Sequence, residues 1–166
     1  MRFVMFYHSL VSDWNHGNAH FLRGVCTELL ANGHDVAVYE PKNGWSLENL
    51  RRDHGDKPLR EFTQHYPQLK TTFYDFESLL LEEALEGADV VLVHEWNPPE
   101  LVQQIGSLRR RSHFKLLFHD THHRAVTAPH EMAKYDLSEY DGVLAFGKVL
   151  EKLYLQKGWA CRAWTW

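Results

Sequence analysis

Short apolar runs recur along the chain, and segments with helical spacing separate most of them. The clearest run, ADVVLV at residues 88–93, is rich in β-branched residues, and FKLLF at residues 114–118 is of the same kind. Such runs are typical of strands that are buried on both faces of a parallel sheet. The complete set of predicted strands comprises residues 2–7, 34–39, 71–74, 88–93, 114–118, 142–146 and 160–166.

Between these runs, apolar residues recur at the spacing of amphipathic helices. Residues 19–32 and 100–111 form the longest stripes, and shorter helices are expected at 76–86, 129–134 and 149–158. Residues 42–70 lack a regular pattern and are expected to form a helical or loop excursion. The alternation predicts an α/β fold with a doubly wound, mostly parallel sheet of six or seven strands and helices on both faces. We expect the strand order 3-2-1-4-5-6, with the seventh strand added.

Polar, titratable residues follow three of the predicted strands. The first strand is followed by one histidine, the fourth by a histidine and a glutamate, and the fifth runs into the sequence HDTHHR. Because parallel strands end at one edge, where ligands bind in open α/β sheets, these groups are expected to share one rim. The candidate site residues on this rim are His8, His94, Glu95, His119, Asp120, His122 and His123.

The connection between the first strand and the first helix, residues 9–18, is long for its kind. It is interpreted as an anion or sugar site at the start of the helix, or else as a polar connection that only caps the helix. Its spacing lacks the G-x-G-x-x-G fingerprint of dinucleotide binding, which argues against NAD. The candidate residues are Asp13, Asn15, His16, Gly17 and Asn18, with Asn15 or Asn18 able to cap the helix.

Charge and composition argue against several classes of protein. A formal net charge of −4 gives no electrostatic footprint for nucleic acid, and the one compact basic run, residues 109–111, is typical of a helix end. Cys26 and Cys161 have no metal-ligand spacing and favour a reduced, cytoplasmic protein. No apolar window approaches transmembrane length, so no transmembrane segment is expected.

The histidines of the rim admit three interpretations. Histidine and carboxylate ligands suit zinc or iron, but no cysteine and no H-E-x-x-H spacing accompanies them, so no metal is expected. A sugar site is the favoured interpretation, because imidazole and carboxylate groups hydrogen-bond hydroxyls without further ligands. The third is a polar network that only stabilises the loops.

Three segments together resemble a known family. HGNAHFLRGVCTELLANGHDVAVYEP (16–41), FHDTHHRAVT (118–127) and YDGVLAFGKVLEKLYLQKG (140–158) are similar to the N-terminal half of two-domain GT-B glycosyltransferases, in particular the CgeB-like and glycosyltransferase family 4-like groups. The similarity covers nearly the whole chain. The chain departs from the family pattern at His16-Gly17, where relatives have paired glycines, and at His122 and His123, where they often have Asp or Pro.

The resemblance implies an acceptor-side, Rossmann-like domain whose partner is a C-terminal domain of the same protein. A nucleotide-sugar donor is expected for the whole protein, with no cofactor in this domain. Residues 15–18 would face the donor phosphates, and His119 would lie near the transferred sugar, so that His119 with Asp120 are the candidate catalytic residues.

The expected function is therefore transfer of a sugar from a nucleotide-sugar to an unknown acceptor, by a chain inactive without its second domain. A non-catalytic binding or dimerisation module on the same fold and, less favoured, a metal-dependent hydrolase remain alternatives. The aromatic segment ending at Trp166 would leave apolar surface uncovered, which favours an N-terminal half or a chain that pairs with a second copy.

Overall fold

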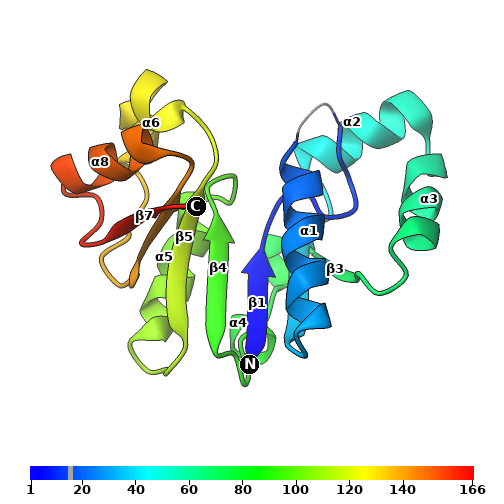
Figure 1. Cartoon of the computed structure of the whole chain (residues 1–166), viewed down its shortest axis with the longest axis horizontal. Coiled ribbons are helices and arrows are strands. Elements are labelled where there is room, and N and C mark those ends of the chain that lie inside the picture. The colour runs from blue at the N-terminus through cyan, green and yellow to red at the C-terminus, as the bar shows by residue number, and fades with distance from the viewer. Residues whose placement is uncertain (15–16) are drawn as a thin grey trace.

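All seven strands form one parallel sheet with the order β3-β2-β1-β4-β5-β6-β7. The computed structural model describes residues 1–14 and 17–166, and Figure 1 shows the central strands running in one direction. The predicted fold class and strand order are confirmed. The strands are β1 (Arg2–Phe6), β2 (Asp35–Pro41), β3 (Thr71–Tyr74), β4 (Val90–His94), β5 (Lys115–Asp120), β6 (Gly142–Ala145) and β7 (Ala163–Thr165).

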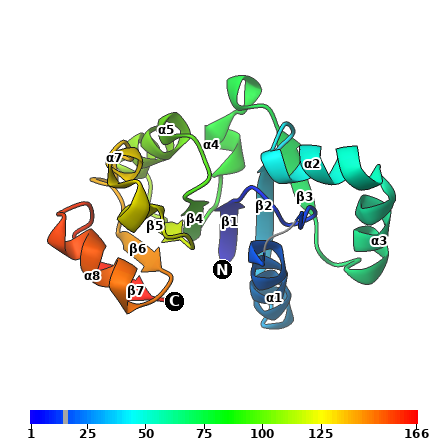
Figure 2. The same cartoon turned by 90° about the horizontal axis from the view of Figure 1, so that it is seen from above.

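Helices cover both faces of the sheet, as Figure 2 shows with α1 on one side and α4, α5 and α7 on the other. Two apolar clusters fill the layers, one between the sheet and α1 with α3, the other beneath α4, α5, α7 and α8. The fold is thus Rossmann-like. The helices are α1 (Asn18–Ala31), α2 (Trp45–His54), α3 (Lys57–His65), the 3₁₀ turn η1 (Phe76–Ser78), α4 (Leu81–Ala84), α5 (Pro99–Arg109), α6 (Arg124–Thr127), α7 (Pro129–Met132) and α8 (Lys148–Gln156).

The predicted helix at residues 76–86 is wrong in extent. Leu79 and Leu80 have extended backbone angles, which separate η1 from the single turn of α4. That turn already buries Leu81, Ala84 and Leu85 against the sheet, while Leu80 stays 61% exposed. One turn therefore satisfies the leucine pattern that we interpreted as a longer helix.

The irregular stretch between β2 and β3 folds into α2 and α3, which brace the β1–α1 connection. The backbone N–H of Trp14 donates to Ser46 Oγ at 3.3 Å, and its indole Nε1 donates to Asp53 at 2.8 Å. The guanidinium of Arg23 in α1 lies over the Phe62 ring at 5.0 Å. The excursion thus holds Trp14, in the segment that leaves the carboxyl edge of the sheet after β1, and α1.

The described residues contain no helix that is both long and apolar enough to cross a membrane.

Candidate functional site

The carboxyl ends of β1, β4 and β5, which are neighbours in the sheet, bring three histidines together. His94 and His119 are register partners at the ends of β4 and β5, and their rings lie 5.4 Å apart. His8 follows β1, and its ring lies 5.0 Å from that of His94. The expected gathering of these side chains on one rim is confirmed, because parallel neighbouring strands end at the same level.

His119 lies in an aromatic enclosure. Its Nδ1 is hydrogen-bonded to the Tyr7 hydroxyl at 2.7 Å, and the rings of Phe21 and Trp166 lie 5.7 Å and 4.6 Å from it. Only 2% of His119 is exposed, and burial lowers its pKa to about 3. The imidazole is therefore neutral near pH 7, and a neutral imidazole both donates and accepts hydrogen bonds.

Glu95, fully buried, is the centre of the polar layer beneath the rim. One oxygen accepts the Thr121 backbone N–H at 3.1 Å, and the other accepts Nε and Nη2 of Arg124 at 3.1 and 3.0 Å. Burial and the neighbouring Asp120 carboxylate raise the pKa of Glu95 to about 8. Glu95 therefore resists ionisation beside the second buried acid, because like charges at close range disfavour double ionisation.

Asp120, also fully buried, is the last residue of β5 rather than a loop residue. Its carboxylate accepts the Tyr154 hydroxyl of α8 at 2.8 Å and the backbone N–H of His122 at 2.9 Å. Its contacts therefore tie α8 and the following turn to the sheet, and Asp120 supports the site from below.

The β4–α5 turn is held equally firmly. Nε2 of His94 is paired with Thr121 Oγ1 at 3.0 Å. The Asn97 amide donates to the backbone oxygens of Phe6 and His94 at 2.8 and 2.9 Å, which joins β1 to β4 at this edge. A rigid turn of this kind fixes the direction of Trp96.

Trp96 is an exposed aromatic residue of the rim, at 46%. The Arg124 guanidinium stacks on its ring at 4.4 Å, and the rings of His8 and His122 lie 5.9 and 5.7 Å away. His123 is exposed and its ring lies 4.1 Å from that of His122. A ligand arriving at this edge would therefore meet Trp96, His122 and His123 before the buried groups.

The described part of the β1–α1 connection forms contacts with α1 and with the end of β2. Asp13 forms an ion pair with Arg23 at 3.0 Å and lies 3.7 Å from His20. The Val11 backbone N–H donates to the buried Glu40 carboxylate at 3.2 Å. Gly17 occupies the N-cap of α1 without a side-chain cap bond and Asn18 is the first helical residue, so the predicted Asn18 cap is wrong. The candidates Asn15 and His16 lie outside the described residues.

Sequence reasoning missed four residues that organise the edge. The patterns place Tyr7 within a strand and Tyr154 within a helix, and neither Trp96 nor Arg124 stands out from its neighbours. The available signal was adjacency, because Tyr7 and Trp96 directly flank His8 and Glu95. Nothing local indicated Tyr154, which reaches Asp120 across 34 residues.

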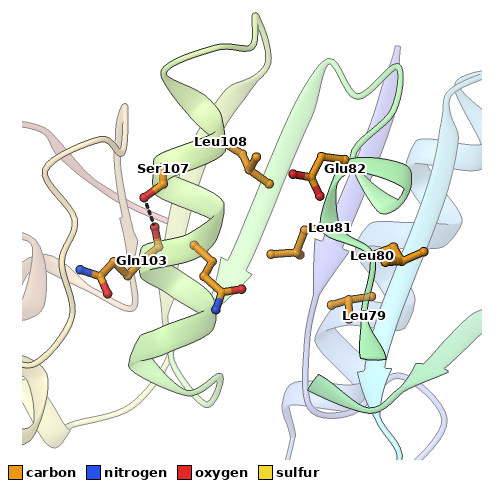
Figure 3. A pocket seen from close by; sticks show the side chains of 8 residues that line it. Leu79, Leu80, Leu81, Glu82, Gln103, Ser107 and Leu108 are labelled. Carbon is orange, nitrogen blue, oxygen red and sulfur yellow. Dashed lines mark hydrogen bonds between the residues drawn. The ribbon is translucent and has the colours of Figure 1, made fainter. Parts of the chain in front are cut away.

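Cavities large enough for a small ligand lie away from the buried His94 and His119. One, of about 310 Å³, is lined by α5 and by the η1–α4 segment, with Leu79, Leu81 and Leu108 among its residues. Figure 3 shows Leu81 and Leu108 between these two segments. A second, of about 440 Å³, lies between Trp14 and the α2–α3 pair. At the carboxyl edge of the sheet, Trp96, His122 and His123 lie over the buried, hydrogen-bonded layer of Glu95 and Asp120.

Within residues 1–14 and 17–166, no group of three or more His, Cys, Asp or Glu side chains is arranged to hold a metal ion. Comparison with protein families, curated proteins and solved structures finds no match for this chain.

Proposed function

We propose that this chain is the acceptor-binding, N-terminal domain of a GT-B glycosyltransferase, which moves a sugar from a nucleotide-sugar to an acceptor. Support comes from the Rossmann-like sheet order 3-2-1-4-5-6-7 and from the segments that resemble that family. Fold alone hosts many functions, so the edge must carry the proposal.

The single observation that carries the proposal is the chemistry of this edge. Neutral His119 lies beside His94 and His8, and an exposed indole stands above a closed layer of acids. Neutral imidazoles exchange hydrogen bonds with hydroxyls in either direction, and indole rings pack on the apolar faces of sugars. The combination suits a polyhydroxylated ring better than a metal or a nucleic acid.

In this proposal His119 lies near the transferred sugar, beneath the exposed residues of the rim. Asp120, enclosed by Tyr154 and the His122 backbone, acts as a positioning residue beneath it. Stabilisation of the departing diphosphate comes from helix N-termini and from the second domain. We therefore expect the present chain to bind sugars and to be inactive in transfer.

The experiment is an NMR titration of ¹⁵N-labelled chain with monosaccharides and with nucleotide-sugars. We expect saccharides to shift the amide signals of His94, His119 and His122, and His119→Ala to abolish those shifts. His113→Ala is the matched control, because His113 is exposed and precedes β5 at the opposite edge of the sheet. Absence of any saccharide-dependent shift at this edge would reject the proposal.

A second candidate, a non-catalytic dimerisation module, is favoured by one observation. Phe21, Trp164 and Trp166 are each 40–44% exposed, and the rings of Phe21 and Trp166 pack 5.2 Å apart. Large exposed apolar patches often mark protein interfaces. Sedimentation equilibrium tests this candidate: a dimer that Trp164→Ser dissociates would favour it, and a monomer would remove it.

A further inference from the structure

Trp96 and Arg124 form a flat, partly exposed surface at the rim. The guanidinium lies 4.4 Å from the indole centre and covers one face of the ring. The rings of His8 and His122 are inclined to the indole by 50° and 65°, so neither stacks flat on it. With Trp96 46% exposed, the open part of its ring is accessible to a flat apolar surface such as one side of a pyranose.

One end of the Arg124 guanidinium is available to hydrogen-bond a ligand. Nε and Nη2 donate to the Glu95 carboxylate, and Nη2 also donates to the Glu95 carbonyl oxygen at 2.7 Å. Nη1 forms no hydrogen bond with any residue that the structure describes, and a guanidinium carries two N–H donors there. A hydroxyl of a ring stacked on Trp96 could accept one of them.

The charge of Arg124 is already compensated by the layer beneath it. Glu95 is fully buried with its carboxylate 3.0 Å from Nη2, and the second buried acid, Asp120, adjoins it. Burial and the nearby Arg124 and His123 hold the pKa of His122 below its ordinary value, so this ring adds no charge at neutral pH. A carboxylate or phosphate brought to the indole would thus meet one guanidinium and two acids, with no net attraction.

We infer that the Trp96–Arg124 surface binds an uncharged sugar ring and discriminates against rings that carry a carboxylate or a phosphate. This inference rests on the proposed function and specifies its acceptor as a neutral saccharide. The ring stacks on Trp96, and its hydroxyls accept from Arg124 Nη1.

The test compares matched pairs of small ligands with the wild-type chain. Methyl glucoside and methyl galactoside are the neutral probes, and glucuronate, galacturonate and glucose 6-phosphate are the charged ones. Saturation-transfer NMR and the shift of the Trp96 indole N–H report binding. We expect the neutral probes to bind about tenfold more tightly than their charged counterparts.

Two variants test whether the preference for neutral probes arises at the Trp96–Arg124 surface. Trp96→Ala should weaken binding of the neutral probes about tenfold, whereas Trp45→Ala, which removes another exposed tryptophan from α2, should leave it unchanged. The double variant Glu95→Gln with Asp120→Asn leaves Arg124 uncompensated and should reverse the preference towards charged probes. If that variant does not fold, the wild-type preference still decides the inference.

The outcomes separate the inference from the proposed function. Tighter binding of charged probes by the wild-type chain, or neutral binding that survives Trp96→Ala, overturns the inference while a sugar site remains. Absence of binding by every probe rejects both.

Discussion

Tyr7 and His119 stand 112 residues apart in the chain and are joined by a hydrogen bond of 2.7 Å at the edge of the sheet. Both are 2% exposed, so neither group can exchange its partner for water. Burial raises the pKa of the Tyr7 hydroxyl well above its ordinary value, which keeps the proton on the phenol. The hydroxyl can therefore donate to Nδ1 and place the ring proton of His119 on Nε2.

Tyr7→Phe should destabilise the chain by about 1–3 kcal/mol, because a buried imidazole nitrogen loses its partner. Urea unfolding measures the change. Tyr39→Phe is the matched control, since Tyr39 is a half-buried strand residue whose hydroxyl has no hydrogen bond among the described residues. Equal losses in the two variants would mean that the Tyr7–His119 bond contributes nothing specific.

Trp166→Ala should raise the pKa of His119 from about 3 towards its ordinary value of 6.5, because the indole that lies 4.6 Å from the imidazole keeps water out. A ¹³C–¹H NMR titration of the ring measures it. Trp164→Ala is the control, as Trp164 has no ring contact with His119 in the described structure.

The sign of the accompanying stability change follows from linkage. A histidine with a depressed pKa in the folded state stabilises the fold fully above pH 6.5, and this contribution is lost as pH falls towards 3. Trp166→Ala should therefore flatten the loss of stability between pH 6.5 and pH 4. An unchanged slope would show that another group governs acid unfolding.

The sequence predicted the sheet because its strands are marked locally. Runs such as residues 88–93 are too short and too β-branched for helices, and their alternation with helical stripes leaves few topologies. The gathering of His8, His94 and His119 follows from that topology, since residues after neighbouring parallel strands meet at one edge. The meeting of these three histidines could therefore be predicted without knowledge of tertiary contacts.

The remaining contacts depend on tertiary distances that no local pattern encodes. The pairing of Arg124 with Glu95 spans 29 residues, and the Tyr154 hydroxyl reaches Asp120 from a helix predicted only to pack apolar residues. Burial of the acids was likewise unpredictable, because strand-end residues become exposed or enclosed according to what α6 and α8 place over them. The ion pair of Asp13 with Arg23 has no local signal either, because it joins the loop to α1 across ten residues.

Glu95→Gln should remove a loss of stability at alkaline pH. The folded-state pKa of Glu95, about 8, lies above the ordinary value of 4.5, so its contribution is complete below pH 4.5 and is lost as pH rises through 8. The difference in melting temperature between pH 6 and pH 9 should shrink by at least about 5 °C in the variant. Glu100→Gln, an exposed position in the first turn of α5, should leave the difference unchanged.

Gly142→Ala should destabilise the chain and open the site at once, whereas Gly24→Ala should stabilise it. A Cβ on Gly142 would collide with the outer ring atoms of Trp164 and lie 3.0 Å from the Arg162 backbone oxygen, so the Trp164 indole must shift and β7 must yield at Arg162. Overpacking of this kind costs about 1–3 kcal/mol. Because β7 leads into Trp166, its displacement should also raise the pKa of His119.

Gly24 lies inside α1 with nothing within 4 Å of an added Cβ, and Gly24→Ala should increase the free energy of unfolding by up to about 1 kcal/mol. Urea unfolding and the His119 titration measure both variants; a stable Gly142→Ala chain with an unshifted His119 would mean that β7 does not hold the cover over the imidazole.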